Sequence, residues 1–181
     1  MKKIGILLAD GFEEIEALTV ADICRRAGIV AGLISVTDSK TVVGAHKITV
    51  QADEVIANAV FEGLQGIVLP GGMPGTRNLK NHPGVKEAIR NMYDSERLVA
   101  AICAAPSILG EMGILDGTKA TVYPGCEAGE QVHWTGALVE RSGHVITGKG
   151  PGAATVFALE LVDYLEGHEK AEEIRAGLMM E

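Results

Sequence analysis

The chain has 181 residues, of which 47% are apolar, so it can bury a sizeable core and is not expected to be disordered. Sixteen lysine and arginine residues against 24 acidic ones give a net charge of −8. This balance argues against a nucleic-acid partner, because a phosphate backbone is bound by clustered cations. The longest apolar run, at residues 98–109, contains a proline and is too short for a bilayer, and no cleavage site follows the apolar start. We therefore expect neither a membrane partner nor secretion.

Short apolar runs alternate with helical patterns along the chain. In chain order, the pattern predicts a strand at 3–9, a helix at 12–28, a strand at 29–36, a hairpin or edge excursion at 41–56, a strand at 66–70, a glycine-rich turn at 70–75, a helix at 82–96, a strand at 97–103, a helix at 105–115, a strand leading into a turn at 119–125, a hairpin at 137–148, and helices at 150–167 and 168–178.

Repeated strand–helix units of this kind predict an α/β fold with an open, mostly parallel sheet covered by helices on both faces. Ligands of such sheets bind beyond the carboxyl ends of the strands. Three loops are expected there, at residues 10–16, 71–75 and 103–107.

Cys103 lies where the predicted strand 97–103 gives way to a helix, which is the position of the nucleophile in a strand–turn–helix elbow. The positive end of that helix is expected to lower the thiol pKa, although an unreactive buried cysteine is the alternative. Cys24 is better explained by core packing, and Cys126 is an oxidisable turn residue with nothing nearby to activate it. Because the three cysteines form no short-spaced pair, we expect reduced thiols and a cytoplasmic location.

Three acidic residues, Glu13, Glu14 and Glu16, open the first predicted helix, where acidic residues are ordinary. Glu16 lies one turn in, and burial over the sheet edge would raise its pKa and let it donate to a thiolate or move a proton. After the strand at 66–70, Gly71 and Gly72 offer backbone N–H groups that could hold an oxyanion, or they form only a tight turn.

Two other patterns are rejected as binding sites. Residues 148–153 match a dinucleotide-binding fingerprint, but they lack the following strand and acidic residue that such a site needs. The five histidines show no metal-ligand spacing. We therefore expect neither a cofactor nor a metal.

Several motifs together resemble the ThiJ/PfpI superfamily, and within it the branch of the parkinsonism-associated deglycase and its bacterial relatives. The resemblance implies a single domain over residues 1–181 with a flavodoxin-like fold, usually assembled as a homodimer. It also implies that Cys103 is the elbow nucleophile, that Glu16 is its carboxylic acid partner, and that Gly71 and Gly72 flank the thiol with backbone donors. The segments that carry it, in the family's order, are "LADGFEEIEA", "LPGGMPGTRNL", "AAICAAPSIL" and "GPGAATVFALELV".

Two positions depart from patterns within that superfamily. Ala104 follows the cysteine where the peptidase branch places a histidine, which argues against a cysteine peptidase. Tyr123 precedes Pro124 where several members of the nearest branch have histidine, and a phenol is a poor base at neutral pH. Tyr123 and Ala104 are nevertheless expected, with the two glycines, to contact the substrate or its oxyanion.

The residues and the resemblance together predict a cofactor-independent, cysteine-dependent enzyme of small α-oxoaldehydes. It would convert methylglyoxal to lactate as a glyoxalase, or remove glycation as a deglycase, in carbonyl or oxidative stress. The alternative is a non-catalytic redox sensor or chaperone that uses an oxidisable Cys103. The expected partners are a small aldehyde or glycated substrate and a second copy of the chain.

Overall fold

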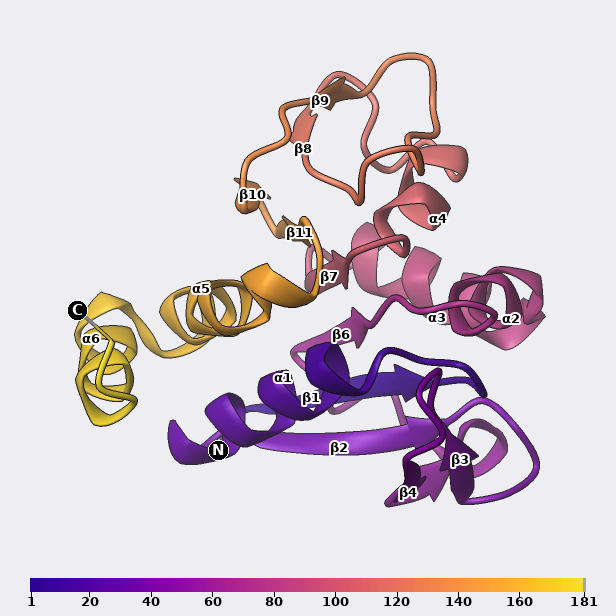
Figure 1. Ribbon diagram of the computed structural model, residues 1–181, viewed down its shortest axis with the longest axis horizontal. Helices are drawn as coiled ribbons and strands as arrows, with labels where there is room; N and C mark the ends of the chain where they lie inside the picture. Colours follow the sequence, from indigo (N-terminus) through magenta and orange to yellow (C-terminus); the bar gives the residue numbers. More distant parts are fainter. Residues whose placement is uncertain (181) are drawn as a thin grey trace.

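The computed structural model describes residues 1–180, and a seven-stranded sheet runs through its centre (Figure 1). All neighbouring strands of this sheet are parallel except the pair at one edge, β10 (Val139–Ser142) and β11 (Val145–Gly148), which is antiparallel and forms the predicted hairpin. The α/β fold with an open, mostly parallel sheet is therefore confirmed. The strands in spatial order are β10 (Val139–Ser142), β11 (Val145–Gly148), β7 (Leu98–Ile102), β6 (Gly66–Leu69), β1 (Lys3–Leu8), β2 (Val30–Ser35) and β5 (Glu54–Val55).

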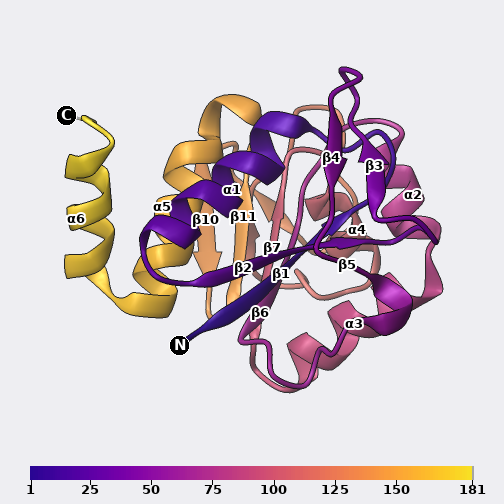
Figure 2. The same ribbon diagram turned by 90° about the horizontal axis from the view of Figure 1, so that it is seen from below.

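Helices cover both faces of the sheet, as Figures 1 and 2 show. One face carries α1 (Glu14–Arg26) and α5 (Ala154–Glu166), with α6 (His168–Gly177) packed outside α5. The other face carries α2 (Gly75–Asn81), α3 (Pro83–Asp94) and α4 (Pro106–Glu111). None of the helices within residues 1–180 is long and apolar enough to cross a membrane.

Two hydrophobic cores result, one on each face of the sheet. Successive side chains of a strand point to opposite faces, so Ile6 and Leu8 of β1 join the core beneath α1 and α5, whereas Leu7 joins the core beneath α3. Strands buried on both faces appear in the sequence as continuous apolar runs, which is why the pattern located them.

Outside the main sheet, β3 (Thr41–Val43) and β4 (Thr49–Gln51) form the antiparallel hairpin expected within residues 41–56. The strand expected at 119–125 is much shorter, because only β8 (Lys119–Ala120) pairs, in parallel with β9 (His133–Trp134). Short 3-10 turns, η1 (Ile56–Asn58) and η2 (Pro151–Ala153), precede β6 and α5.

Helix α2 is not predicted by the sequence pattern. Leu79 is its one large buried apolar side chain, so the segment shows no helical periodicity. The helix expected at 105–115 ends at Glu111, and Gly113 beyond it has the positive φ of +71° that closes the helix end.

Candidate active site

Cys103 follows β7 directly and lies in a strained turn before α4. Its φ is +64°, a left-handed conformation that side-chain-bearing residues rarely adopt. The backbone is held there from both sides, because the Cys103 N–H donates to Gly148 O at 2.9 Å and Tyr123 N–H donates to Cys103 O at 2.8 Å. The structure thus has the sharp strand-to-helix turn that the sequence predicts at this residue.

Glu16 lies in the first turn of α1 and is fully buried. Its Oε2 accepts the Gly71 N–H at 2.7 Å, and the Cys103 thiol lies close enough to lower the pKa of the carboxyl, while Oε1 has no hydrogen-bond partner within residues 1–180. Burial raises the pKa of Glu16 to about 7, with the charge of Glu13 adding to the shift and the bonds to Gly71 and Cys103 opposing it. The carboxyl is therefore buried beside the thiol, as the sequence analysis expects.

The thiol pKa differs from the expectation. Burial, together with the charge and proximity of the Glu16 carboxylate, raises the pKa of the Cys103 thiol to about 12. The helix α4, whose positive end is expected to lower the thiol pKa, has only six residues and begins three positions later, at Pro106. Burial thus favours the uncharged form of both groups.

The two glycines after β6 have different roles. The Gly71 N–H is used by Glu16, so it does not face an oxyanion as the sequence analysis expects. A side chain at Gly71 would place its Cβ 2.6 Å from the Cβ of Cys103, which explains why glycine is required there. The backbone N–H groups of Gly72 and Ala104 instead lower the pKa of the Cys103 thiol and so oppose its rise.

Tyr123 lines a small cavity of about 190 Å³ beside the Cys103 backbone. Half of the Tyr123 side chain is exposed, and its ring packs near Gly150. Sequence reasoning missed the rest of the lining, because it treated residues 148–153 only as a failed dinucleotide motif. The other lining residues are Pro124, Leu138, Lys149, Pro151, Gly152 and Ala153.

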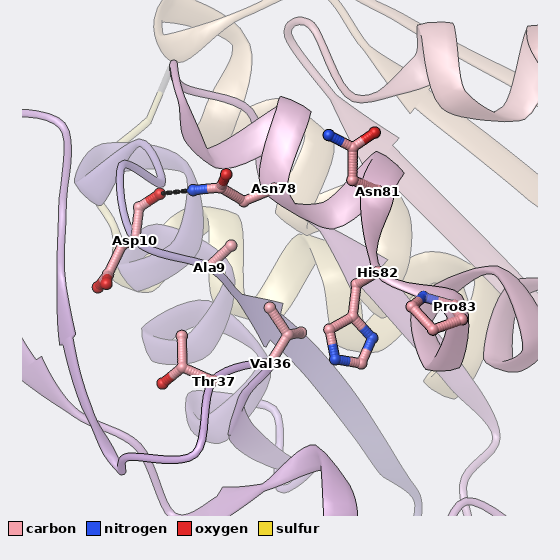
Figure 3. Close-up of a pocket in the computed structure, with 8 residues that line it drawn as sticks. All are labelled: Ala9, Asp10, Val36, Thr37, Asn78, Asn81, His82 and Pro83. Carbon is pink, nitrogen blue, oxygen red and sulfur yellow. Dashed lines mark hydrogen bonds between the residues drawn. The ribbon is translucent and has the colours of Figure 1, made fainter.

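A second cavity, of about 270 Å³, opens at the carboxyl ends of β1 and β2 (Figure 3). In it, Asn78 Nδ2 donates to the backbone oxygen of Asp10 at 2.9 Å, and His82 lies opposite. Neither Cys103 nor Glu16 lines this cavity, so it is separate from the reactive pair.

The other two cysteines differ in their surroundings. Cys24 is fully buried in the core beneath α1, and burial raises its pKa to about 12, in agreement with a packing role. Cys126 is half-buried in a turn closed by its N–H to Tyr123 O at 3.0 Å. All three cysteines are free.

Comparison with known proteins identifies the family. The sequence profile described as the DJ-1/PfpI family matches residues 2–164. The chain belongs to this family. The Parkinson disease protein 7 homolog of Danio rerio is 35% identical over 184 residues, which cover 99% of this chain and 97% of that protein.

Solved structures of the family show the same fold over the whole chain. Oxidized DJ-1 from Toxoplasma gondii is 32% identical, with a TM-score of 0.93 and 99% of both chains covered. The C103A mutant of a DJ-1 superfamily protein from Salmonella typhimurium is also 32% identical, with a TM-score of 0.93 over all of both chains. The resemblance to the ThiJ/PfpI superfamily is thereby confirmed.

Proposed function

We propose that this member of the DJ-1/PfpI family is a cofactor-independent enzyme that uses Cys103 to convert small α-oxoaldehydes, such as methylglyoxal, to hydroxy acids. The main support is the fully buried Glu16 carboxyl, which accepts the Gly71 N–H and lies close enough to the Cys103 thiol for each group to shift the pKa of the other. A carboxylate with a pKa near 7 is matched to proton transfer at neutral pH.

The first step is addition of sulfur to the aldehyde. The Glu16 carboxylate takes the Cys103 proton as the C–S bond forms, so the thiol needs no low pKa of its own. The aldehyde π electrons move to oxygen, where the N–H groups of Gly72 and Ala104 stabilise the negative charge. Protonation of that oxygen by Glu16 completes a hemithioacetal and regenerates the carboxylate.

The second step moves a proton between neighbouring carbons. Glu16 removes the proton from the carbon bonded to sulfur, which gives an enediolate, and returns it to the adjacent carbon, while the hydroxyl proton passes from the first oxygen to the second. The product is a thioester of lactate on Cys103, and water cleaves it to lactate and the free thiol. Overall, one methylglyoxal and one water give one lactic acid, and no electrons leave the substrate.

The cavity of about 190 Å³ beside Tyr123 is lined by neither Cys103 nor Glu16, and it adjoins the reactive pair only through the Tyr123 N–H, which donates to Cys103 O. Deglycation would use the same addition on an aldehyde-derived adduct. The free thiols are consistent with action in the reducing cytoplasm.

A redox-sensing function is the second candidate, because a related structure, that of Toxoplasma gondii DJ-1, is of the oxidized protein. In this case peroxide would oxidise the Cys103 sulfur to sulfenate and then sulfinate, with the peroxide reduced to water or alcohol. The same Glu16 carboxyl would hydrogen-bond the oxidised sulfur.

Turnover separates the two functions. The purified chain should form many equivalents of lactate from methylglyoxal without glutathione, at a rate below about 10 per second because Tyr123 cannot assist as a base. In D₂O, the second carbon of lactate should carry mostly hydrogen rather than deuterium if Glu16 transfers the proton directly between the two carbons. Cys103→Ser should abolish turnover, with Cys126→Ser as the matched control. Equal lactate from wild type and Cys103→Ser, together with rapid oxidation of Cys103 by peroxide, would replace the enzyme with the sensor.

A further inference from the structure

Two buried threonines lie next to the backbone that holds Cys103 in its strained turn. Thr147 lies in β11 with 2% of its surface exposed, and Thr121 follows β8 and is fully buried. The Thr121 N–H donates to the Thr147 hydroxyl oxygen at 2.9 Å. Neither side chain belongs to the Glu16–Cys103 pair, so the proposed reaction does not explain why the two residues are joined.

Thr147 occupies a position that an apolar side chain could fill. Val145, two residues earlier in β11 and therefore on the same face of the sheet, joins the core beneath α3. Valine and threonine have nearly the same shape, but threonine places a hydroxyl in the core, and a buried hydroxyl is costly unless it forms a hydrogen bond. The polar residue at this position therefore indicates that its hydroxyl is needed as a hydrogen-bond partner.

The Thr147 hydroxyl takes the place of a neighbouring strand. Residues 121–123 run on from β8 but belong to no strand, so they lack the ladder of backbone hydrogen bonds that would fix them beside β11. Instead, the Thr121 N–H donates to the Thr147 side chain, and the Tyr123 N–H donates to Cys103 O at 2.8 Å. The segment is thus joined to β11 at its first residue and to the cysteine at its last.

These hydrogen bonds close a ring that contains the N–H and the C=O of Cys103. The Cys103 N–H donates to Gly148 O at 2.9 Å, and Gly148 follows Thr147 in β11. From Thr147 the ring runs through Thr121 to Tyr123 and back to Cys103 O. The left-handed φ of +64° is unfavourable for a residue with a side chain and persists only where surrounding contacts fix it. Within this ring, Thr147 supplies the one hydrogen bond that depends on a side chain, so a substitution can remove it.

We propose that Thr147 is a positioning residue for Cys103, because its hydroxyl holds the segment of residues 121–123 in the place where it fixes the strained turn. Without the hydroxyl, the Thr121 N–H has no acceptor in the core, and the segment shifts to find one. Cys103 O then loses the Tyr123 N–H, and the turn relaxes. The sulfur moves away from its carboxyl partner, so the thiol loses the neighbour that assists its reaction.

Alkylation of Cys103 by iodoacetamide in the folded protein tests this role. Thr147→Val should lower the rate at neutral pH by about tenfold or more, since an unsatisfied buried N–H costs about as much free energy as a tenfold change in an equilibrium. Thr147→Ser keeps the acceptor and should label within about threefold of the wild-type rate. Thr147→Ala, a second variant without the hydroxyl, should follow Thr147→Val.

The matched control removes a threonine hydroxyl elsewhere in the fold. The Thr118 hydroxyl donates to Leu115 O at 2.8 Å, beyond the end of α4 that is farther from Cys103. Thr118→Val should therefore lose a hydrogen bond by the same chemical change and yet label Cys103 at the wild-type rate. Urea denaturation shows whether each variant is folded under the labelling conditions.

A crystal structure of Thr147→Val provides the second measurement. The distance from Tyr123 N to Cys103 O should exceed hydrogen-bond distance, and the Cys103 φ should leave the left-handed region, whereas Thr147→Ser keeps both. Labelling at the wild-type rate or faster, or an unchanged turn in Thr147→Val, would overturn the role and leave Thr147 as a core residue. The inference rests on the Glu16–Cys103 pair of the proposed function, but neither readout needs a substrate, so failure to turn over methylglyoxal would refute the proposed function alone.

Discussion

Glu16 and Cys103 titrate as a pair, because each group's charge lies against the other in a buried site. Burial raises the pKa of Glu16 to about 7, and burial together with the Glu16 charge raises the pKa of Cys103 to about 12. A charged Glu16 carboxylate therefore opposes ionisation of the thiol. Reactivity of the thiol therefore depends on the ionisation of its neighbour.

The pH dependence of alkylation tests this coupling. The rate at which iodoacetamide labels Cys103 should rise with pH and level off above an inflection near pH 7, because the Glu16 carboxylate removes the thiol proton. Glu16→Gln should move the inflection toward the higher pKa of an unassisted thiol. Mass mapping of the labelled peptides gives the rate at each cysteine.

Cys24 is the internal reference for that experiment. It is fully buried with a raised pKa, so it should react only in denaturant. An identical inflection in wild type and Glu16→Gln would show that the carboxyl does not control the thiol, and equal labelling of Cys24 in the native protein would contradict the burial.

Only part of the candidate site could be predicted from the local sequence. The turn at Cys103 could be predicted, because a strand and a helix meet at this residue and small residues surround it. Its pairing with Glu16 joins distant segments, and only the family resemblance suggested it. The role of Gly71 depends on the direction of one N–H, and the hydrogen bond from Thr121 to Thr147 joins separate segments, so neither leaves a local pattern.

Among the elements, β2 has an edge that side chains cover. Its partner β5 pairs only with Ile34 and Ser35. Along the rest of the edge, the Arg25 guanidinium donates to Ala31 O at 2.7 Å, and the Leu33 N–H donates to an Asp53 carboxylate oxygen at 2.8 Å. Unpaired edges invite pairing with other chains, so these contacts protect the strand.

Removing one of these contacts should destabilise the fold. Asp53→Ala leaves the Leu33 N–H without its acceptor and should lower the free energy of unfolding by about 1 kcal/mol or more. Asp22→Ala is the matched control, because Asp22 makes only an exposed helical pair with Arg26, at 2.7 Å, and should cost no more than about 0.5 kcal/mol. Urea denaturation measures both. Equal losses would mean that the edge contact contributes no more than a surface ion pair.

The depth of burial explains which helices and strands could be predicted from the sequence. The central strands β1, β6 and β7 are buried on both faces and appear as apolar runs. By contrast, β8 pairs through two residues only, and α2 has one large buried apolar side chain, so tertiary contacts rather than local pattern determine them.

On the scale of the whole molecule, several large apolar side chains are exposed at the surface. The mean hydropathy is +0.20, and Ile15 and Ile48 are each more than half exposed. These two residues lie near each other, because the Ile48 N–H contacts the Glu14 carboxylate at 3.4 Å and Ile15 follows Glu14 in the chain. Exposed apolar groups that lie together are typical of surfaces that contact another protein.

We expect the chain to form a homodimer that buries part of this surface, since twofold dimers are the commonest closed assemblies. Light scattering at micromolar concentration should give twice 19.0 kDa. Ile15→Ser should shift the protein toward the monomer, because it removes an apolar side chain from the patch on α1. Leu138→Ser, at an exposed leucine beside Tyr123, should leave the mass unchanged. A wild-type mass of 19.0 kDa would contradict the dimer and show that the exposed apolar side chains remain in water. Loss of the dimer in Leu138→Ser but not in Ile15→Ser would instead place the dimer interface on the Tyr123 side.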